Sequence, residues 1–141
     1  MDEIDTNIVE ILEKNALISS DAVAKMVNTS PPTVRRRIAK LVKDGIINIV
    51  AKVSLEKVGP YITIGIGMHT DTDKIDSIAA KLIQHPHIKQ VAFTTGTCNL
   101  QALTTFRSTD DFSNFLQTYL SNIEGLKVVE TNIFIKKWGG D

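Results

Sequence analysis

The sequence predicts an α+β protein in two parts, three short helices followed by a β-α-β-β-α-β unit. In the first part the apolar residues recur at the spacing of a helix face, as Ile4, Ile8, Ile11 and Leu12 do. From Tyr61 onward, stretches of strict alternation are separated by stretches of helical spacing. That order of strands and helices is typical of a ferredoxin-like unit.

Capping residues locate the helices of the first part. Ser19 or Ser20 is expected to cap the second helix, because a serine hydroxyl accepts a hydrogen bond from an early helix amide. Ser30 is expected to cap the third helix, which runs to about Lys43. A tight turn at Asn28-Thr29 joins these two helices. Three short helices with this turn predict a helix-turn-helix domain.

An extended segment and a linker are expected to follow. Ile46 to Leu55 alternates, which predicts a connecting strand. Lys57, Gly59 and Pro60 indicate a linker over residues 56–60. We therefore expect one domain over residues 1–55 and a second over residues 61–141.

Six elements are expected in the second domain. They are strands over residues 61–70, 88–95, 100–106 and 126–138 and helices over residues 73–85 and 109–120. The last strand is apolar in both registers, with Val128 and Phe134 on one face and Val129, Ile133 and Ile135 on the other. Because the two helices cover only one face of the sheet, a second apolar face predicts a homodimer.

Composition restricts the possible functions. The 141 residues carry a formal net charge of zero, so nucleic-acid binding requires a local basic patch. Cys98 is the single cysteine, which excludes an internal disulfide and a multi-cysteine metal site. The chain has no basic start followed by an apolar run, and no apolar stretch approaches about 20 residues. We therefore expect a cytoplasmic protein that does not enter a membrane.

The third helix carries such a basic patch. No acid lies between Lys25 and Lys43. At roughly 100° per residue, Arg36 lies about 200° from the apolar Val34. Arginine can form paired hydrogen bonds to guanine, and lysine can neutralise phosphate. A solvated basic face is the alternative. The pattern predicts binding to double-stranded DNA through Ser30, Pro32, Thr33, Arg35, Arg36, Arg37 and Lys40.

Arg37 lies nearer the buried stripe of this helix than the other arginines do. Two roles are open for it. It either forms an ion pair with an acid such as Asp5 or contacts a DNA phosphate.

The same segments resemble the Lrp/AsnC family of transcription regulators, also called feast/famine regulators, over essentially the whole chain. The resemblance implies that the helix-turn-helix domain is winged or wing-less, winged-helix-like in type, and is joined by a strand to a βαββαβ domain. It also implies an oligomer, a dimer or an octamer, that regulates transcription and commonly binds a free amino acid through the βαββαβ domain. It rests on Asp2, Asp5, Ile8, Leu12, Ala24, the run Ser30-Pro31-Pro32-Thr33-Val34, Arg37-Ile38, Leu41 and Asp44-Gly45-Ile46-Ile47, together with the Thr95-Gly96 turn.

The resemblance also implies an effector site at the turn Gly96-Thr97-Cys98-Asn99, with Thr131 as a further lining residue. The family pattern has an aspartate three residues after the glycine, whereas this chain has Asn99. Asn99 keeps a carbonyl acceptor but has no charge to hold a ligand ammonium. A plain hairpin turn is the alternative. We expect no cofactor other than such an amino-acid effector.

Other functions find less support. His69, His85 and His87 lack the accompanying ligands of a metal site, and no nucleophile and base are placed together. We therefore expect no bound metal and no enzyme activity. The alternative function is a metabolite-sensing or protein-interaction module with degenerate DNA binding.

Overall fold

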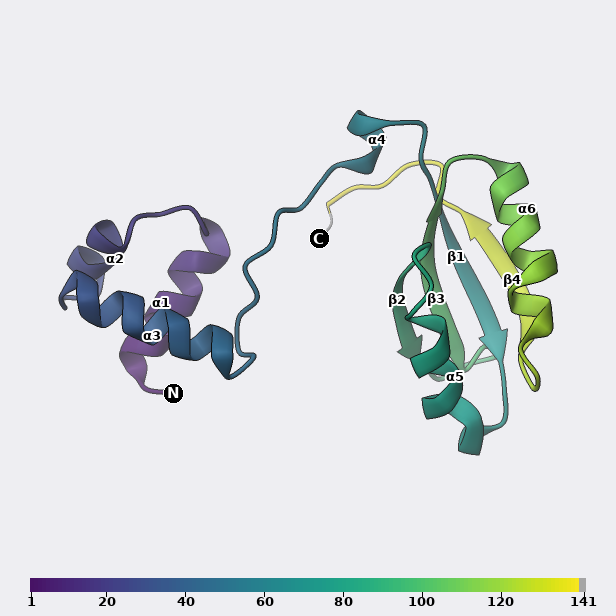
Figure 1. Cartoon of the computed structure of the whole chain (residues 1–141), viewed down its shortest axis with the longest axis horizontal. Coiled ribbons are helices and arrows are strands. Elements are labelled where there is room, and N and C mark those ends of the chain that lie inside the picture. Colours follow the sequence, from purple (N-terminus) through teal and green to yellow (C-terminus); the bar gives the residue numbers. More distant parts are fainter. Residues whose placement is uncertain (140–141) are drawn as a thin grey trace. The chain divides into compact units, whose positions relative to one another are not determined.

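The computed structural model describes residues 1–139, which form two compact units, the first ending at Lys52 and the second beginning at Val53 (Figure 1). Residues 140–141, the end of the expected second domain, lie outside the described residues. None of the helices in residues 1–139 has the length and apolar character that a membrane crossing requires. The main elements are α1 (Glu3–Lys14), α2 (Ser20–Met26), α3 (Pro31–Lys43), α4 (Leu55–Val58), β1 (Ile62–His69), α5 (Ile75–Leu82), β2 (Ile88–Phe93), β3 (Leu100–Phe106), α6 (Thr109–Thr118) and β4 (Lys127–Ile133), with 3₁₀ turns at Thr72–Lys74 and Leu120–Asn122.

The first unit is a three-helix domain, as predicted. Ser19 caps α2 and Ser30 caps α3 through their hydroxyl groups, while Asp2 and Asp5 form a reciprocal capping box on α1. The turn between α2 and α3 contains Asn28 at φ 54°, a left-handed conformation that asparagine tolerates. The three helices enclose one core, made of Ile8, Leu12, Val23, Ala24, Val34 and Leu41.

The strand predicted over Ile46 to Leu55 does not form within the single chain. Residues 46–54 form neither helix nor strand, and Leu55–Val58 is the short helix α4. A strand needs hydrogen-bonding partners along its edge, and residues 1–52 contain no other strand to provide them. Ile47 instead packs against the helical core, while Ile49 and Val50 remain exposed.

The second unit has the predicted ferredoxin-like architecture. Its four described strands form one antiparallel sheet in the order β2-β3-β1-β4, visible in Figure 1. Helices α5 and α6 cover one face, where Ile64, Ile66 and Met68 of β1 pack against Leu82, Phe112 and Phe115. We call the other face of the sheet the open face.

The predicted side-chain faces of the last strand are wrong. Gly67 pairs with Glu130 but Met68 pairs with Val128, so Val129 is an extra residue, a β-bulge. Paired residues of antiparallel strands point to the same face. Val128 therefore lies on the helix-covered face, where it packs against the core, whereas Phe134 lies over Gly65 on the open face.

The open face is also less apolar than predicted. Leu103 and Phe134 are the large apolar side chains on the rim of its groove, and most other side chains that line it are small or polar. The last strand contributes less to this face than expected, because the bulge directs Val128 into the core. Because the open face is more polar than predicted, it supports a homodimer less strongly than the sequence suggested.

Candidate functional site

The exposed face of α3 is basic, with small residues at its N-terminal end. Pro32, Arg35, Arg36 and Lys40 are exposed, and Thr33 is half-buried. The Ser30 hydroxyl accepts a hydrogen bond from the backbone N–H of Thr33 at 3.4 Å. Among the described side chains, neither Arg35 nor Arg36 has an acidic partner. Both guanidinium groups are therefore available to an external anion.

Lys40 differs from these arginines because it already has an acidic neighbour. Its Nζ lies 2.7 Å from Asp44 Oδ2, one helical turn along α3. This hydrogen bond raises the pKa of Lys40. The pair is largely exposed, with side-chain exposed fractions of 72% and 40%, so solvent competes with it and a phosphate can displace the carboxylate.

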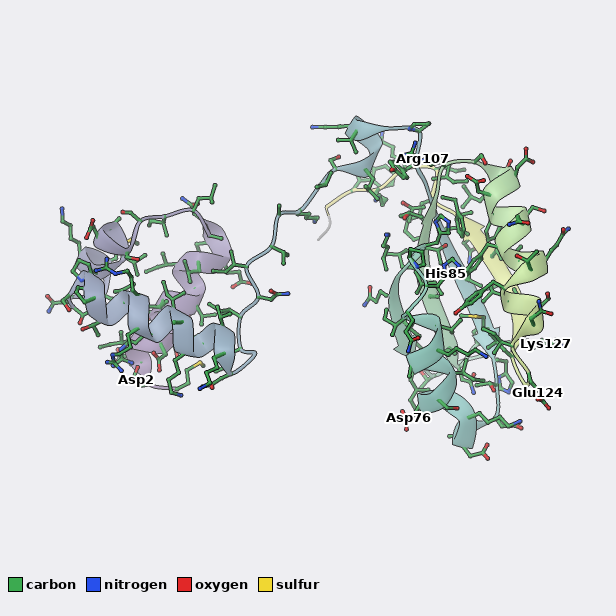
Figure 2. All side chains as sticks on the ribbon, viewed as in Figure 1. Asp2, Asp76, His85, Arg107, Glu124 and Lys127 are labelled. Atoms are coloured by element: carbon green, nitrogen blue, oxygen red, sulfur yellow. The ribbon has the colours of Figure 1, made fainter. Side chains whose placement is uncertain are left out.

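Arg37 ties α3 to the start of α1. Its Nη1 donates to Asp2 Oδ2 at 2.7 Å and to Asp5 Oδ1 at 2.8 Å, and Figure 2 shows Asp2 beside α3. The backbone N–H of Asp5 and then Arg37 lower the pKa of Asp2, while Arg37 is the main cause of the lowered pKa of Asp5. Of its two expected roles, the structure shows the ion pair, and contact with a DNA phosphate stays a prediction.

The turn after β2 borders a shallow cavity of about 320 Å³. Gly96, Thr97 and Cys98 line it, as expected, together with Gln101 of β3 and Glu130 of β4. Neither Asn99 nor Thr131 lines it. The structure thus brings together three of the five predicted effector residues.

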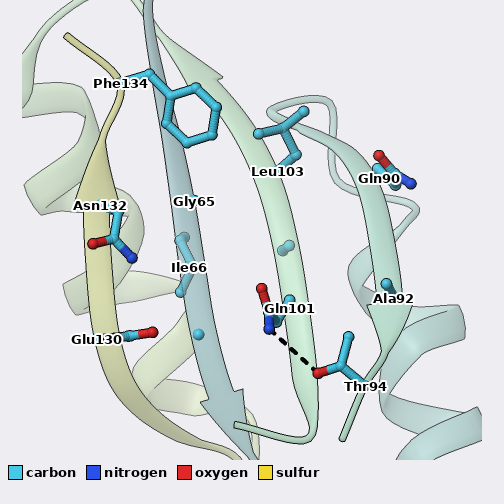
Figure 3. Close-up of a pocket in the computed structure, with 12 residues that line it drawn as sticks. Gly65, Ile66, Gln90, Ala92, Thr94, Gln101, Leu103, Glu130, Asn132 and Phe134 are labelled. Carbon is cyan, nitrogen blue, oxygen red and sulfur yellow. Dashed lines mark hydrogen bonds between the residues drawn. The ribbon is translucent and has the colours of Figure 1, made fainter. Parts of the chain in front are cut away.

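A larger groove of about 460 Å³ runs across the open face of the sheet (Figure 3). Gly65 and Gly67 of β1 form part of its floor. Gln101 and Glu130 line both this groove and the cavity at the turn, from the strands on either side of β1. Among the side chains that the structure describes, no group of three or more His, Cys, Asp or Glu is arranged to hold a metal ion.

Two family models match the chain. The model described as winged helix-turn-helix DNA-binding matches residues 1–48, and the Lrp/AsnC ligand binding domain matches residues 61–138. An HTH-type transcriptional regulator of Pyrococcus furiosus is 30% identical, over 99% of this chain and 96% of its own length. The chain belongs to the Lrp/AsnC family. It is a DNA-binding transcription regulator with a ligand-binding domain, as the sequence predicted.

Solved structures agree with the assignment. AsnC of E. coli superposes on this Lrp/AsnC protein with a TM-score of 0.81 at 27% identity, covering 97% of this chain and 93% of that one. A transcriptional regulator of Neisseria meningitidis, solved as a complex with L-Met, has a TM-score of 0.80 at 22% identity, with coverages of 99% and 93%. The second likeness concerns the fold alone.

Asn99 has a structural role in this Lrp/AsnC protein. Its side-chain Oδ1 accepts from the backbone N–H of Thr70 at 3.1 Å, and its Nδ2 donates to the carbonyl of Thr70 at 2.8 Å. The amide thus pairs with Thr70 much as a neighbouring strand would, which requires a donor and an acceptor on one side chain. A carboxylate has no donor, so the asparagine suits this contact.

Thr131 is directed away from the turn. It pairs with Ile66, whose side chain is 2% exposed in the core, so Thr131 points to the helix-covered side of the sheet. Its neighbours Glu130 and Asn132 point to the open face instead.

Sequence reasoning missed Glu130 as a residue that lines both cavities. Its place follows from the pairing with Gly67, which depends on the bulge at Val129. The sequence offered one signal for this position, a carboxylate in a predicted strand whose other residues are mostly apolar or uncharged.

Proposed function

We propose that this Lrp/AsnC regulator binds specific duplex DNA as a homodimer, and that a small molecule in its second domain modulates the binding. The observation that carries the proposal is the exposed face of α3, where Arg35 and Arg36 have no acidic partner among the described side chains. These two guanidinium groups are the proposed base and phosphate contacts.

The N-terminal end of α3 suits close approach to a base pair. Ser30 and Pro32 are exposed and Thr33 is half-buried there, and all three side chains are short. In helix-turn-helix proteins the N-terminal residues of the second helix contact the base edges in the major groove. Lys40 lies further along the helix, and we assign it to phosphate after release from Asp44.

Two observations support a dimer. The exposed groups on one α3 offer few phosphate contacts on a chain of zero net charge, so useful affinity needs a second copy of the helix. In addition, the alternating segment around Ile49 and Val53 is exposed and has no strand partner among the described residues of its own chain. The same segment of a second copy would provide that partner by antiparallel pairing about a two-fold axis. Larger oligomers, such as an octamer, remain a further prediction.

The proposed modulation rests on the cavities of the second domain, at the turn Gly96–Cys98 and across the open face. The regulator of Neisseria meningitidis was solved with L-Met, which makes amino acids the first ligands to test here. We do not assign enzyme activity, because the relatives are transcriptional regulators.

Fluorescence anisotropy with duplexes from the promoter of the protein's own gene tests the DNA proposal. Arg36→Ala is expected to weaken specific binding about 5- to 150-fold, the value of one good base contact. If Arg36 instead contacts a phosphate, the plot of log binding constant against log salt concentration loses about one unit of slope in the variant. Binding to every DNA sequence then weakens by the same factor. Lys81→Ala, which removes an exposed cation of α5, is the matched control and should bind as the wild type does.

Sedimentation measurements on the same samples test the dimer. A monomer at concentrations where DNA is bound would contradict the two-fold arrangement. Unchanged specific binding by both Arg35→Ala and Arg36→Ala would contradict the assignment of α3. Weak binding with little salt dependence would favour a domain that contacts proteins instead.

A further inference from the structure

The segment that joins α5 to β2 carries two histidines whose rings lie against each other. The ring centroids of His85 and His87 are 5.4 Å apart, in a stacked arrangement. The His85 ring also contacts the rings of Phe115 and Tyr119 on α6, at centroid distances of 4.8 and 4.4 Å. The His87 ring packs on Phe106 of β3 at 4.6 Å. Both imidazoles are therefore held in place and partly shielded from solvent.

Hydrogen bonds determine which ring nitrogen carries the proton in each neutral histidine. The backbone N–H of His87 donates to His85 Nδ1 at 3.2 Å, so this nitrogen keeps its lone pair and His85 carries its proton on Nε2. His87 Nδ1 lies 2.9 Å from the carbonyl oxygen of Thr105, which can only accept a hydrogen bond. His87 therefore carries its proton on Nδ1. The two neutral rings are opposite tautomers.

A further proton has a different effect on each ring. On His87 it adds at Nε2 and leaves the contact with the Thr105 carbonyl intact. On His85 it adds at Nδ1, the atom that accepts from the His87 backbone. Two N–H groups then point at each other, and the hydrogen bond cannot form. The contact between the His85 ring and the His87 backbone therefore exists only while His85 is neutral.

The surroundings of His85 favour its neutral form. Burial, and then the neighbouring His87, lower the pKa of His85. The elements around it carry further titratable groups, which are Asp76 and Lys81 on α5, Lys89 on β2, Asp110 and Asp111 on α6, Tyr119 at the end of α6 and Arg107 after β3. Of these, Asp111 and Tyr119 line the pocket of about 240 Å³ beside the two histidines. Asp111 is exposed, so solvent weakens its attraction for a histidine cation.

The hydrogen bond to His85 lies where an edge strand of the sheet begins. In the order β2-β3-β1-β4, β3 is the one partner of β2 among the described strands. Directly before β2, the Thr105 N–H donates to the His87 carbonyl at 3.0 Å, beside the contact of the His87 ring with the Thr105 carbonyl. The position of the His87 backbone therefore determines how β2 begins to pair with β3.

We propose that His85 and His87 form a pH-sensitive switch at the start of β2. When His85 is neutral, its Nδ1 holds the His87 backbone in position to pair with Thr105. When His85 is protonated, that hydrogen bond is lost and the start of β2 loosens from β3. The switch belongs to the second domain and requires neither DNA nor a small molecule, so it goes beyond the function proposed above.

Nuclear magnetic resonance of the full-length protein tests the switch directly. At about pH 7.5, ¹⁵N spectra of the imidazole rings should show His85 with its proton on Nε2 and His87 with its proton on Nδ1. As the pH is lowered to about 5, protonation of the His85 ring should shift the backbone amide signal of His87 at the same midpoint. The protection factor of the Thr105 amide against hydrogen exchange should fall with it.

Urea unfolding of a variant tests the same switch through stability. Because the folded-state pKa of His85 is lowered, its contribution to stability is complete above the ordinary value of 6.5 and is lost as the pH falls below it. The unfolding equilibrium constant should rise by up to about tenfold per pH unit for this one proton. His85→Asn should lack this component, since an asparagine carbonyl can accept from the amide two residues on but takes up no proton. His69→Asn, which changes an exposed histidine at the end of β1, is the matched control and should keep the wild-type pH dependence.

Three results would overturn the inference. The first is a neutral His85 ring that carries its proton on Nδ1. The second is protonation of His85 without a shift of the His87 amide signal. The third is the same pH dependence of unfolding in the wild type and in His85→Asn. If His85→Asn does not fold, the two resonance measurements on the wild type decide. None of these measurements involves DNA, so failure of the switch and failure of the proposed function are distinguishable.

Discussion

Replacing Asn99 with aspartate restores the residue usual in the Lrp/AsnC pattern, yet the structure predicts that it destabilises the second domain. The Asn99 amide both accepts from and donates to the backbone of Thr70, at 3.1 and 2.8 Å. An aspartate keeps the acceptor and loses the donor. It also places a negative oxygen against the carbonyl of Thr70.

The size of the effect follows from these two contacts. Leaving a partly buried carbonyl without its donor costs about 1–3 kcal/mol. We therefore expect Asn99→Asp to lower the free energy of unfolding by about 2 kcal/mol at neutral pH. For a domain of this size that corresponds to a fall in Tm of roughly 8–16 °C. Asn132→Asp is the matched control, because Asn132 is exposed and forms none of the hydrogen bonds described for Asn99.

Thermal and urea unfolding, followed at several pH values, check the prediction. In the variant, the protonated form of the new carboxyl group can donate to the Thr70 carbonyl again, so the fold favours that form and raises the pKa of the group. A raised folded-state pKa stabilises the fold at low pH, and this stability is lost as the pH rises. The deficit of Asn99→Asp relative to the wild type should thus shrink in acid. Equal stability of Asn99→Asp and Asn132→Asp, without such a pH dependence, would refute the reasoning.

Two further predictions concern other contacts. In the folded protein the pKa values of Asp2 and Asp5 lie below their ordinary value of 3.8. The two ionised carboxylates therefore stabilise the fold above pH 3.8, and this stabilisation is lost as the pH falls through the lowered pKa values. Arg37→Ala should therefore destabilise the first domain near neutral pH and differ progressively less from the wild type in strong acid, as measured by circular dichroism; a constant difference would contradict the ion pair. Gly67→Ala should lower the free energy of unfolding of the second domain by about 1–3 kcal/mol, because a Cβ there would meet Glu130 Cγ at 2.9 Å and Cys98 Sγ at 2.7 Å. A wild-type free energy of unfolding in that variant, measured by urea denaturation, would show that these two side chains move aside without cost.

The helices were predictable because their determinants are local. A cap such as Ser30 acts within one turn of its own helix, and the spacing of Val34 and Leu41 marks the buried face directly. The ion pair of Arg37 with Asp5 was one of two expected roles, since helical projection places Arg37 near the buried stripe. The basic face of α3 follows from the same periodicity.

The failures concern contacts between distant segments. The alternation around Ile49 is compatible with a strand, but the sequence of the segment does not show whether another strand is available to pair with it. The last strand was apolar in both registers, which is compatible with a bulge, yet the position of the extra residue at Val129 depends on its pairing with β1. Likewise, the contact of Asn99 with Thr70 joins residues 29 positions apart, so a turn motif by itself could not reveal it.

These distant contacts explain how the site differs from the family pattern. Asn99 and Thr70 fasten the turn to the end of β1, and the Thr70 hydroxyl donates to the carbonyl of Gly125 just before β4, at 2.8 Å. One neutral side chain thus helps to fix both the turn and the approach to the strand that carries Glu130. A carboxylate at position 99 would lose the donor to the Thr70 carbonyl and so disturb both connections. The structure therefore favours a neutral side chain with both a donor and an acceptor at position 99 of this ligand-binding domain.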